Sequence, residues 1–193
     1  MLFETTPISG AILVQLEPHA DSRGAFARTF CTAEFGAAGL PTQFCQANLS
    51  QSKTRDTLRG MHYQLAPHAE GKLIRCTAGA LQDVIVDLRP DSPSFRQHYA
   101  TVLSAENQAA LYLPPGVAHG FLTLAPDTEA HYWVTSPYAP EAERGFRFDD
   151  PWLALEWAAR PQVVSDKDSS WPSYDPRFHR LEQLRGLVSG NAT

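Results

Sequence analysis

The sequence is short of the residues that build disulfide frameworks, structural zinc sites and membrane spans. Its 193 residues include three cysteines, Cys31, Cys45 and Cys76, and no two of them have the C-x-x-C spacing. An odd number of scattered cysteines is typical of reduced thiols in the cytosol. No apolar run approaches the ~20 residues of a membrane helix, and the N-terminus lacks the basic start and apolar block of a signal peptide. We therefore expect a cytoplasmic protein that does not enter a membrane.

Basic charge is also scarce. The 16 Lys and Arg residues are outnumbered by 21 Asp and Glu, which gives a formal net charge of −5. Nonspecific binding to nucleic acid requires a basic surface, so we expect no nucleic-acid partner. A few converging arginines and lysines can still bind a small anionic ligand.

Short strand-like segments separated by turn signals make up most of the chain. They lie at 11–19, 25–30, 42–50, 57–64, 71–79, 81–89, 97–104, 110–116, 120–125 and 129–136. About nine strands at such short spacing predict an all-β sandwich or barrel. One short helix is expected at 32–40, with Thr32 as its N-cap and Gly39 as its stop. A single helical turn is expected at 150–158, and the tail after Ser169 has little periodic signal.

Polar residues occur in strands where a barrel core would normally have valine or leucine. Alternation of side chains along a strand places Lys72 on the face of Ile74 and Cys76, and His119 on the face of Phe121 and Thr123. The same rule places His62 with Leu58, Gly60 and Gln64. These neighbours are small or apolar, so the pattern favours a polar, working interior near one mouth of the barrel. The lysine segment also alternates acceptably with the opposite parity.

The segment Leu111–Phe121, LYLPPGVAHGF, is similar to the second motif of the cupin superfamily of small jelly-roll barrels. Cupin metal sites use His-x-His and a glutamate in the first motif, where this chain has His62-Tyr63-Gln64. A stable divalent site needs three or four ligands, and His62 with His119 supplies only two. We therefore expect no metal, and a metal-dependent cupin oxygenase is disfavoured.

Five motifs in collinear order resemble one family, the dTDP-4-dehydrorhamnose 3,5-epimerases. They are TLRGMHYQ, GKLIRCTAGALQDVIVDLRPDSPSF, LSAENQAALYLPPGVAHGF, YAPEAERGFRFDDP and VVSDKD, within a resemblance that runs from about Gly10 to Asp168. The resemblance implies a cupin-like antiparallel jelly-roll barrel with short peripheral helices, in one domain over residues 1–193. The barrel core would span about 10–140, with 141–193 as peripheral segments and tail. It also implies a homodimer with exchanged N-terminal strands, and no metal or other cofactor.

The resemblance assigns four catalytic residues in an epimerase of nucleotide-linked 4-keto-6-deoxy sugars. Inversion beside a ketone needs a base on one face of the carbon, an acid on the other and a group that stabilises the enolate. His62 matches the base, since imidazole titrates near neutral pH, and Asp168 matches its carboxylate partner. Lys72 matches the residue near the 4-keto oxygen, where a cation stabilises developing negative charge. Tyr132 matches the acid that returns a proton from the opposite face.

The resemblance also implies a set of substrate-binding residues. Arg23 and Arg59 match pyrophosphate-binding arginines, which suit charge-assisted hydrogen bonds. The others are Gln46 and Asn48, the sugar-contacting His119, the base-stacking Tyr138, and Phe26, Arg28, Glu143 and Lys167. Strict alternation would put Arg59 and His62 on opposite faces, and a β-bulge at Gly60 would bring them together. Arg28 stands where many relatives have glutamate, which leaves the exact substrate open.

Three functions remain open. The first is epimerisation at C3 and C5 of dTDP-4-dehydro-6-deoxy-D-glucose, which gives dTDP-4-dehydro-L-rhamnose, a precursor for deoxysugars of cell-surface polysaccharides. The second is epimerisation of another nucleotide sugar, or at C3 only. The third is a non-catalytic jelly roll that binds a sugar nucleotide. This third function predicts loss of His62, Lys72 or Tyr132, and all three are present.

Overall fold

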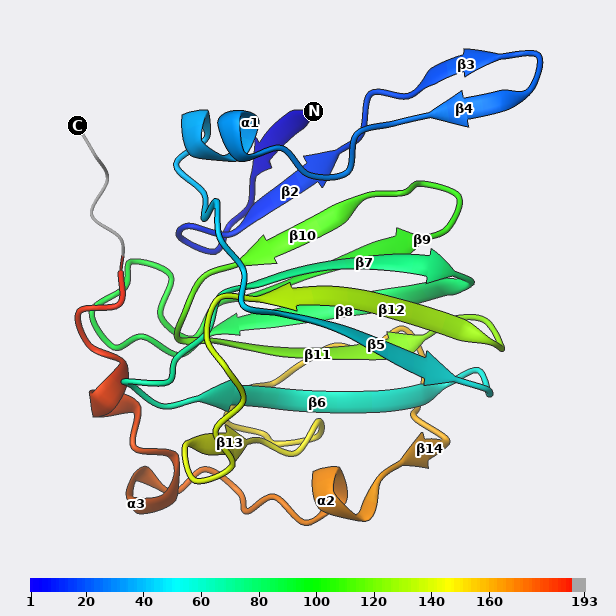
Figure 1. The fold of residues 1–193 in the computed structure, drawn as a ribbon. Helices are drawn as coiled ribbons and strands as arrows, with labels where there is room; N and C mark the ends of the chain where they lie inside the picture. Colours follow the sequence, from blue (N-terminus) through cyan, green and yellow to red (C-terminus); the bar gives the residue numbers. More distant parts are fainter. Residues whose placement is uncertain (189–193) are drawn as a thin grey trace.

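The computed structural model describes residues 1–188, which form two β-sheets that face each other and a small hairpin (Figure 1). The first sheet has the order β1 (Leu2–Thr5), β2 (Ile12–Gln15), β10 (Ala110–Leu113), β7 (Lys72–Ala78), β12 (Thr128–Val134), β5 (Gln46–Ser52). The second has the order β13 (Glu143–Gly145), β6 (Thr57–Gln64), β11 (Val117–Thr123), β8 (Ala80–Asp87), β9 (His98–Ser104). The short β14 (Val163–Val164) pairs parallel to β6, and β3 (His19–Asp21) pairs with β4 (Gly24–Phe26). Few residues are helical; they form α1 (Thr32–Ala37), α2 (Asp166–Ser169), α3 (Pro176–His179) and the 3₁₀ turn η1 (Leu181–Leu184).

The expected mostly β fold is confirmed, but the two sheets do not close into a barrel. β1 and β5 are the edges of the first sheet, and β13 and β9 are the edges of the main path of the second. The predicted strand at 11–19 is divided into β2 and β3, because Pro18 has no N–H to donate to a ladder. The predicted strand at 25–30 ends at Phe26. β1, β13 and β14 were not predicted, since strands of two to four residues show little alternation.

The space between the two sheets is apolar at its centre. Ile74, Cys76 and Leu111 from the first sheet pack against Leu81, Ile85 and Phe121 from the second. Lys72 shares the face of Ile74 and Cys76, and His119 shares the face of Phe121, as alternation predicts. The polar residues therefore point into the same interlayer space as the core, beyond its apolar part.

The outer face of the second sheet is covered by a long segment, and that of the first sheet is covered in part. The second sheet buries Met61, Tyr63, Val84 and Val86 under side chains of the segment after Pro140, among them Phe146, Leu153, Leu181 and Leu184. The first sheet is covered in part by α1, whose Phe35 is fully buried beside Val14 and Tyr112. The C-terminal segment thus fixes the sheet that carries His62, although its elements are too short for the sequence to show a period.

Two local predictions about helices are corrected. The N-cap of α1 is Cys31 and not Thr32, because Thr32 already has helical geometry and no side chain caps the helix. Gly39 ends the helix as expected, in a left-handed conformation with φ of 71°. The helical turn predicted at 150–158 does not form a helix. Asp150 closes a turn by accepting from the Trp152 amide at 2.8 Å, and Ala154 leaves it with φ of 52°.

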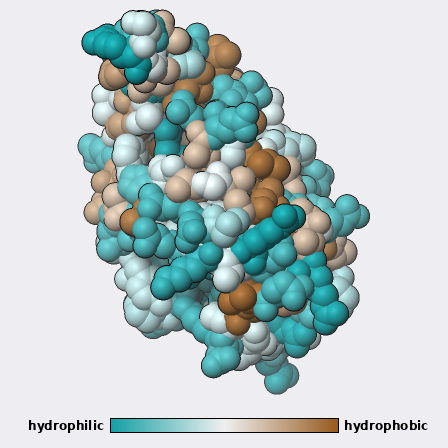
Figure 2. Space-filling model, turned by 90° about the vertical axis from the view of Figure 1, so that its right-hand side faces the viewer, coloured by the Kyte–Doolittle hydropathy of each residue, from teal (hydrophilic) through white to brown (hydrophobic). Residues whose placement is uncertain are grey.

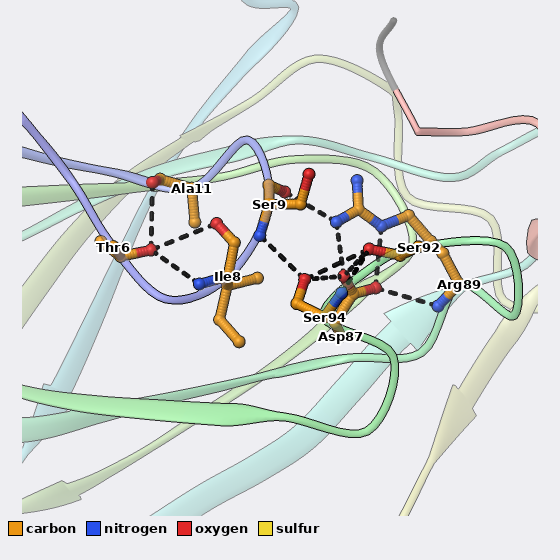
Figure 3. Close-up of polar contacts among 8 residues, drawn as sticks. All are labelled: Thr6, Ile8, Ser9, Ala11, Asp87, Arg89, Ser92 and Ser94. Atoms are coloured by element: carbon orange, nitrogen blue, oxygen red, sulfur yellow. Dashed lines mark hydrogen bonds and ion pairs between the residues drawn. The ribbon is translucent and has the colours of Figure 1, made fainter. Parts of the chain in front are cut away.

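A buried ion pair ties the connection between β1 and β2 to the loop after β8 (Figure 3). The Arg89 guanidinium donates to Asp87 through Nε at 2.8 Å and Nη2 at 2.7 Å, and Nη2 also donates to the Ser9 carbonyl at 2.7 Å. The Ser94 hydroxyl donates to Asp87 at 2.6 Å and accepts from the Ser9 amide at 2.9 Å. Both charges are almost completely buried, and these partners offset their desolvation. β2 also pairs with β10 of its own chain, so this region is bound to its own sandwich.

His179 fastens the C-terminal segment to the strands beside the site. Its ring is fully buried and stacks on Phe146 with ring centroids 3.9 Å apart. Nδ1 lies 3.0 Å from the Asp175 amide nitrogen and 2.9 Å from the Asp175 carbonyl oxygen, and Nε2 lies 3.2 Å from the Gly145 carbonyl oxygen. Burial lowers the pKa of His179, although the surrounding backbone hydrogen bonds partly oppose this.

We expect the free energy of unfolding to fall as the pH is lowered through the ordinary histidine range. The folded pKa of His179 lies below its unfolded value of ~6.5. Between these two pKa values the unfolded chain binds a proton at residue 179 and the folded chain does not. As the pH falls through this range, the contribution of His179 to the free energy of unfolding therefore decreases by up to about 1.4 kcal/mol per pH unit. His179→Gln keeps a donor for Gly145 without titrating in this range. The difference in urea midpoint between wild type and His179→Gln should narrow from pH 7.5 to 5.5; a constant difference would contradict this.

The surface toward which the β3–β4 hairpin points is mostly hydrophilic, with small scattered hydrophobic groups (Figure 2). Among residues 1–188, no helix is long and apolar enough to span a bilayer.

Candidate active site

Two adjoining cavities between the sheets have volumes of about 380 and 280 Å³ and share three lining residues. These are His62 on β6, Lys72 on β7 and Tyr132 on β12. The larger cavity, called the first lobe, is also lined by Gln46, Asn48, Tyr63, Gln64, Glu70, Val134, Tyr138 and Glu143. The smaller cavity, called the second lobe, is also lined by Ser50, Arg59, His119, Phe121, Ser165, Lys167 and Asp168. The shared trio thus lies at the junction of the lobes, with His62 on one sheet and Lys72 and Tyr132 on the other.

His62 forms a close pair with Asp168. His62 Nε2 lies 2.6 Å from Asp168 Oδ1, and the Gly60 amide donates to Oδ2 at 3.2 Å. Burial would raise the pKa of Asp168, but its hydrogen bond and charge interaction with His62, together with donors from Gly60 and Ser165, bring that pKa below its usual value. The carboxylate is therefore ionised at neutral pH and orients the ring through Nε2. The other ring nitrogen, Nδ1, is left for chemistry in the cavity.

A β-bulge at Gly60 brings Arg59 and His62 to the same cavity. The register between β6 and β11 shifts there, since Gly60 and Met61 on β6 lie opposite the single residue Gly120 on β11. Gly60 has φ of 119°, and a Cβ on it would lie 2.5 Å from the Gly120 Cα and 2.8 Å from the His119 carbonyl oxygen. Only glycine allows this contact. The bulge expected from the sequence is confirmed, and His62 accordingly does not share one unbroken strand face with Leu58.

Lys72 is held by a carboxylate that the sequence did not point to. Its Nζ lies 2.9 Å from Glu70 Oε1, and both side chains are about one-tenth exposed. Gln64 donates to the other oxygen of Glu70 at 2.9 Å. Gln64 stands where a cupin would have its second ligand histidine, and here it positions a carboxylate instead.

His119 has a similar carboxylate partner. His119 Nε2 lies 2.8 Å from Asp83 Oδ2, and Asp83 on β8 is fully buried. The other oxygen, Asp83 Oδ1, has no hydrogen-bond partner among the described residues. His119 on β11 is the register partner of His62 on β6, so the two histidine–aspartate pairs lie on neighbouring strands.

An acidic group at the rim of the first lobe connects two predicted binding residues. Glu143 accepts from the Tyr138 hydroxyl at 2.7 Å, and Lys167 Nζ lies 2.7 Å from both of its oxygens. Burial would raise the pKa of Glu143, but the bonds from Lys167 and Tyr138 lower it below the usual value. The hydrogen bond to Glu143 raises the pKa of Tyr138. Tyr138 remains about half exposed, so its ring is free to contact a ligand.

The chain is similar to known proteins along most of its length. The sequence profile of the dTDP-4-dehydrorhamnose 3,5-epimerases matches residues 5–175. The chain belongs to this family. A relative named dTDP-4-dehydrorhamnose 3,5-epimerase from Sinorhizobium fredii is 42% identical over 174 residues, which cover 90% of this chain and 89% of that protein. The resemblance that the five motifs indicated is thereby confirmed.

Solved structures of family members have the same fold. The Bacillus anthracis dTDP-4-dehydrorhamnose 3,5-epimerase, solved with TDP and PPi bound, is 38% identical, with a TM-score of 0.85 over 89% of this chain and 97% of that one. A 3'-monoepimerase from Streptomyces bikiniensis, in complex with dTDP-quinovose, is 33% identical, with a TM-score of 0.82 over 92% of this chain and 90% of that one. The chain is thus similar in structure both to an enzyme named a 3,5-epimerase and to one named a 3'-monoepimerase.

Most residues predicted from the family resemblance line the two lobes. His62, Lys72 and Tyr132 line both; Asp168, Arg59, His119 and Lys167 line the second; Gln46, Asn48, Tyr138 and Glu143 line the first. Glu70 and Asp83 were missed, because each becomes visible only through its contact with a predicted residue. Trp171 was also missed, and its ring lies edge-on to His62 with centroids 6.2 Å apart.

Three predicted binding residues are not in these lobes within one chain. Arg23 lies at the tip of the projecting β3–β4 hairpin, where it pairs with Asp21 and its side chain is 86% exposed (Figure 1). Phe26 is 71% exposed at the end of β4. Arg28 pairs with Glu34 at 3.1 Å and lines a separate cavity together with Phe26. A single chain therefore does not bring these three side chains to His62.

The part of the chain that the structure describes contains no cluster of residues suited to binding a metal ion. No three His, Cys, Asp or Glu residues within 1–188 are arranged to hold an ion. His62 and His119 each place Nε2 against an aspartate. Independence from metal stays a prediction that activity measurements must test.

Proposed function

We propose that the chain is an isomerase that inverts C3 and C5 of dTDP-4-dehydro-6-deoxy-D-glucose to give dTDP-4-dehydro-L-rhamnose. Family membership supports the reaction class. The observation that carries the proposal is the junction of the two lobes, where His62 and Tyr132 come from opposite sheets and Lys72 lines the same space. A sugar bound there would have a base on one face of its ring and an acid on the other.

In this mechanism, His62 Nδ1 removes the proton from the carbon beside the 4-keto group. Nε2 keeps its proton toward Asp168, whose carboxylate stabilises the imidazolium that forms. The electron pair of the broken C–H bond moves to the keto oxygen, and the Lys72 ammonium stabilises the enolate. Tyr132 then donates its hydroxyl proton to the opposite face of the carbon. Exchange with water returns the proton to Tyr132 and removes the one on His62.

The nucleotide part of the substrate would use the charged and aromatic residues around the junction. Arg59 and Lys167 of the second lobe are cations suited to the pyrophosphate. Arg59 is already oriented by Ser52 at 3.2 Å and the Gln51 carbonyl at 2.9 Å. Gln46, Asn48 and Tyr138 supply polar and stacking contacts in the first lobe.

Epimerisation at C3 only is the second candidate. The structural likeness to a 3'-monoepimerase of the same family keeps it open, and Arg28 adds an unusual charge in a predicted binding position. The catalytic trio is common to both candidates, so the difference must lie in how the sugar ring sits at the junction.

One experiment separates these candidates. The protein is incubated with dTDP-4-keto-6-deoxyglucose in deuterated water, and NMR follows deuterium at each sugar carbon. Exchange at C3 and C5 supports the 3,5-epimerase, and exchange at C3 alone supports the second candidate. The absence of any exchange would leave a non-catalytic sugar-nucleotide-binding protein. The same reaction in EDTA tests metal independence, where we expect unchanged rates.

We infer that two chains form a dimer in which N-terminal residues of one complete the site of the other. The support is the position of Arg23 and Phe26, two predicted substrate ligands on an exposed hairpin that lines neither of the two lobes of its own chain. The hydrogen bond from Arg89 to the Ser9 carbonyl and the pairing of β2 with β10 fix the region before residue 16 to the sandwich of its own chain. The hairpin from His19 to Phe26 is therefore the segment free to reach a partner. Such an enzyme would act in the cytoplasm.

Mixing two inactive variants should restore activity if the hairpin is shared. Arg23→Ala weakens the pyrophosphate contact, which costs on the order of 2–5 kcal/mol for a charged partner, and His62→Ala removes the base. In a mixed dimer, the chain that retains His62 would receive the intact hairpin of its partner. The assay uses a substrate concentration too low for Arg23→Ala alone to turn over efficiently. The two variants refolded together should then be clearly more active than the summed activities of the two variants refolded separately. A 21.3 kDa species by light scattering, or no complementation, would contradict the shared site.

A further inference from the structure

Glu70 is a buried carboxylate in the first lobe that the proposed mechanism does not use. Its side chain is about one-tenth exposed, and its Oε1 lies 2.9 Å from Lys72 Nζ. Lys72 has no other ion-pair partner among residues 1–188. Lys72, the lysine that lines both lobes, is thus held by one acidic side chain.

The carboxylate of Glu70 is itself held from the other side. The two N–H groups of Gln64 Nε2 are shared among three acceptors, Glu70 Oε2 at 2.9 Å and the carbonyls of His68 at 3.0 Å and Pro137 at 3.2 Å. Gln64 Oε1 accepts from the Ala139 amide at 2.6 Å, and Gln64 is almost fully buried. The amide of Gln64 is therefore fixed, and it fixes Glu70 in turn.

The backbone between Glu70 and Lys72 is equally constrained. The Gly71 amide donates to the Thr135 hydroxyl at 2.8 Å, and the Thr135 amide donates to the Gly71 carbonyl at 3.0 Å. A Cβ on Gly71 would lie 2.9 Å from the Tyr112 hydroxyl oxygen, so a side chain there would have to displace the Tyr112 side chain on β10. Glu70 and Lys72 are thus presented from a rigid turn against the ends of β10 and β12.

These constraints matter because lysine is flexible. Its ammonium group lies at the end of four flexible methylene groups, so an unrestrained lysine side chain places its charge at many different positions. Stabilisation of an enolate requires the charge to be in place before the reaction. A neighbouring carboxylate also offsets the cost of desolvating the ammonium in a buried position.

We propose that Glu70 is a positioning residue that holds the Lys72 ammonium at the junction of the two lobes. This inference rests on the proposed function of Lys72 as the group that stabilises the enolate. Glu70 acts through Lys72 and does not touch the sugar. Its contribution therefore exists only while Lys72 is present.

A double-mutant cycle tests this dependence. The variants are Glu70→Ala, Lys72→Met and the double variant, with Glu106→Ala as control, since Glu106 lies in an exposed turn outside both lobes. Deuterium exchange into dTDP-4-keto-6-deoxyglucose gives the rate, and substrate titration separates kcat from KM. Glu70→Ala should lower kcat about ten- to a hundredfold in wild type, part of the effect of losing a stabilising donor, with KM changed less than threefold. In the Lys72→Met background the same change should alter the rate less than threefold.

The outcomes are distinct. An equal loss in both backgrounds, or a wild-type kcat for Glu70→Ala, overturns the role of Glu70. Failure of wild type itself to exchange the sugar protons instead overturns the proposed function. If Glu70→Ala is poorly folded by circular dichroism, Glu70→Gln replaces it in the cycle. That variant keeps the size and one acceptor oxygen, and it should lower kcat about three- to tenfold in wild type and not at all in Lys72→Met; equal losses would again overturn the proposal.

Discussion

Replacement of His62 with alanine should eliminate turnover and solvent exchange together. His62 is the proposed base, and without it no C–H bond beside the ketone is broken. A positioned base contributes up to about 10⁴-fold, and we expect a loss of that order in both kcat and the rate of deuterium incorporation. NMR in deuterated water measures both quantities in one sample.

The matched control is His98→Ala, because His98 is an exposed histidine on β9 outside both lobes. It should react like wild type. Exchange at the wild-type rate in His62→Ala would mean that another group removes the proton, and the two-face mechanism would have to be abandoned.

Tyr132→Phe should separate exchange from inversion. The substitution keeps the ring and removes only the hydroxyl, so substrate should still bind at the junction of the lobes. His62 can still form the enolate and return a proton or deuteron to the face that it left. Inverted product should fall by roughly 10²–10⁴-fold, the usual contribution of a positioned acid, while deuterium still enters the unreacted sugar. The measurement compares deuterium incorporation with product stereochemistry.

Tyr99→Phe is the control for loss of a tyrosine hydroxyl, since Tyr99 lies on β9 and lines neither lobe. It should leave both quantities unchanged. Inversion at the wild-type rate in Tyr132→Phe would show that Tyr132 is not the acid.

Local sequence patterns were sufficient for parts of the fold. Alternation put Lys72 and His119 on the core-facing sides of their strands, and Gly60 indicated the bulge that brings Arg59 beside His62. The failures occurred where tertiary contacts decide the local structure. Residues 150–158 have a composition compatible with a helical turn, but their aromatic and aliphatic side chains cover the outer face of the second sheet, with Asp150 closing the turn.

The candidate site was only partly predictable for a related reason. Nothing near Asp168 in the sequence indicates that it pairs with His62, which is 106 residues away, and only the family resemblance suggested it. Glu70 and Asp83 have no motif of their own, and their roles come from strand pairing and side-chain contacts. Arg23, Phe26 and Arg28 line neither lobe within one chain, and a second copy is the proposed source of their contacts.

The contact between Gly60 and Gly120 has a consequence for recognising related proteins. The two backbones meet so closely that a side chain on either glycine would separate β6 from β11, and a Cβ on Gly120 would also lie 2.6 Å from Met61 Sδ. Arg59 and His62 flank that contact on the strand. A distant homologue can therefore retain every catalytic side chain and still lose their alignment through one alanine. Glycine at both positions is a criterion for transferring the activity between sequences, independent of percentage identity.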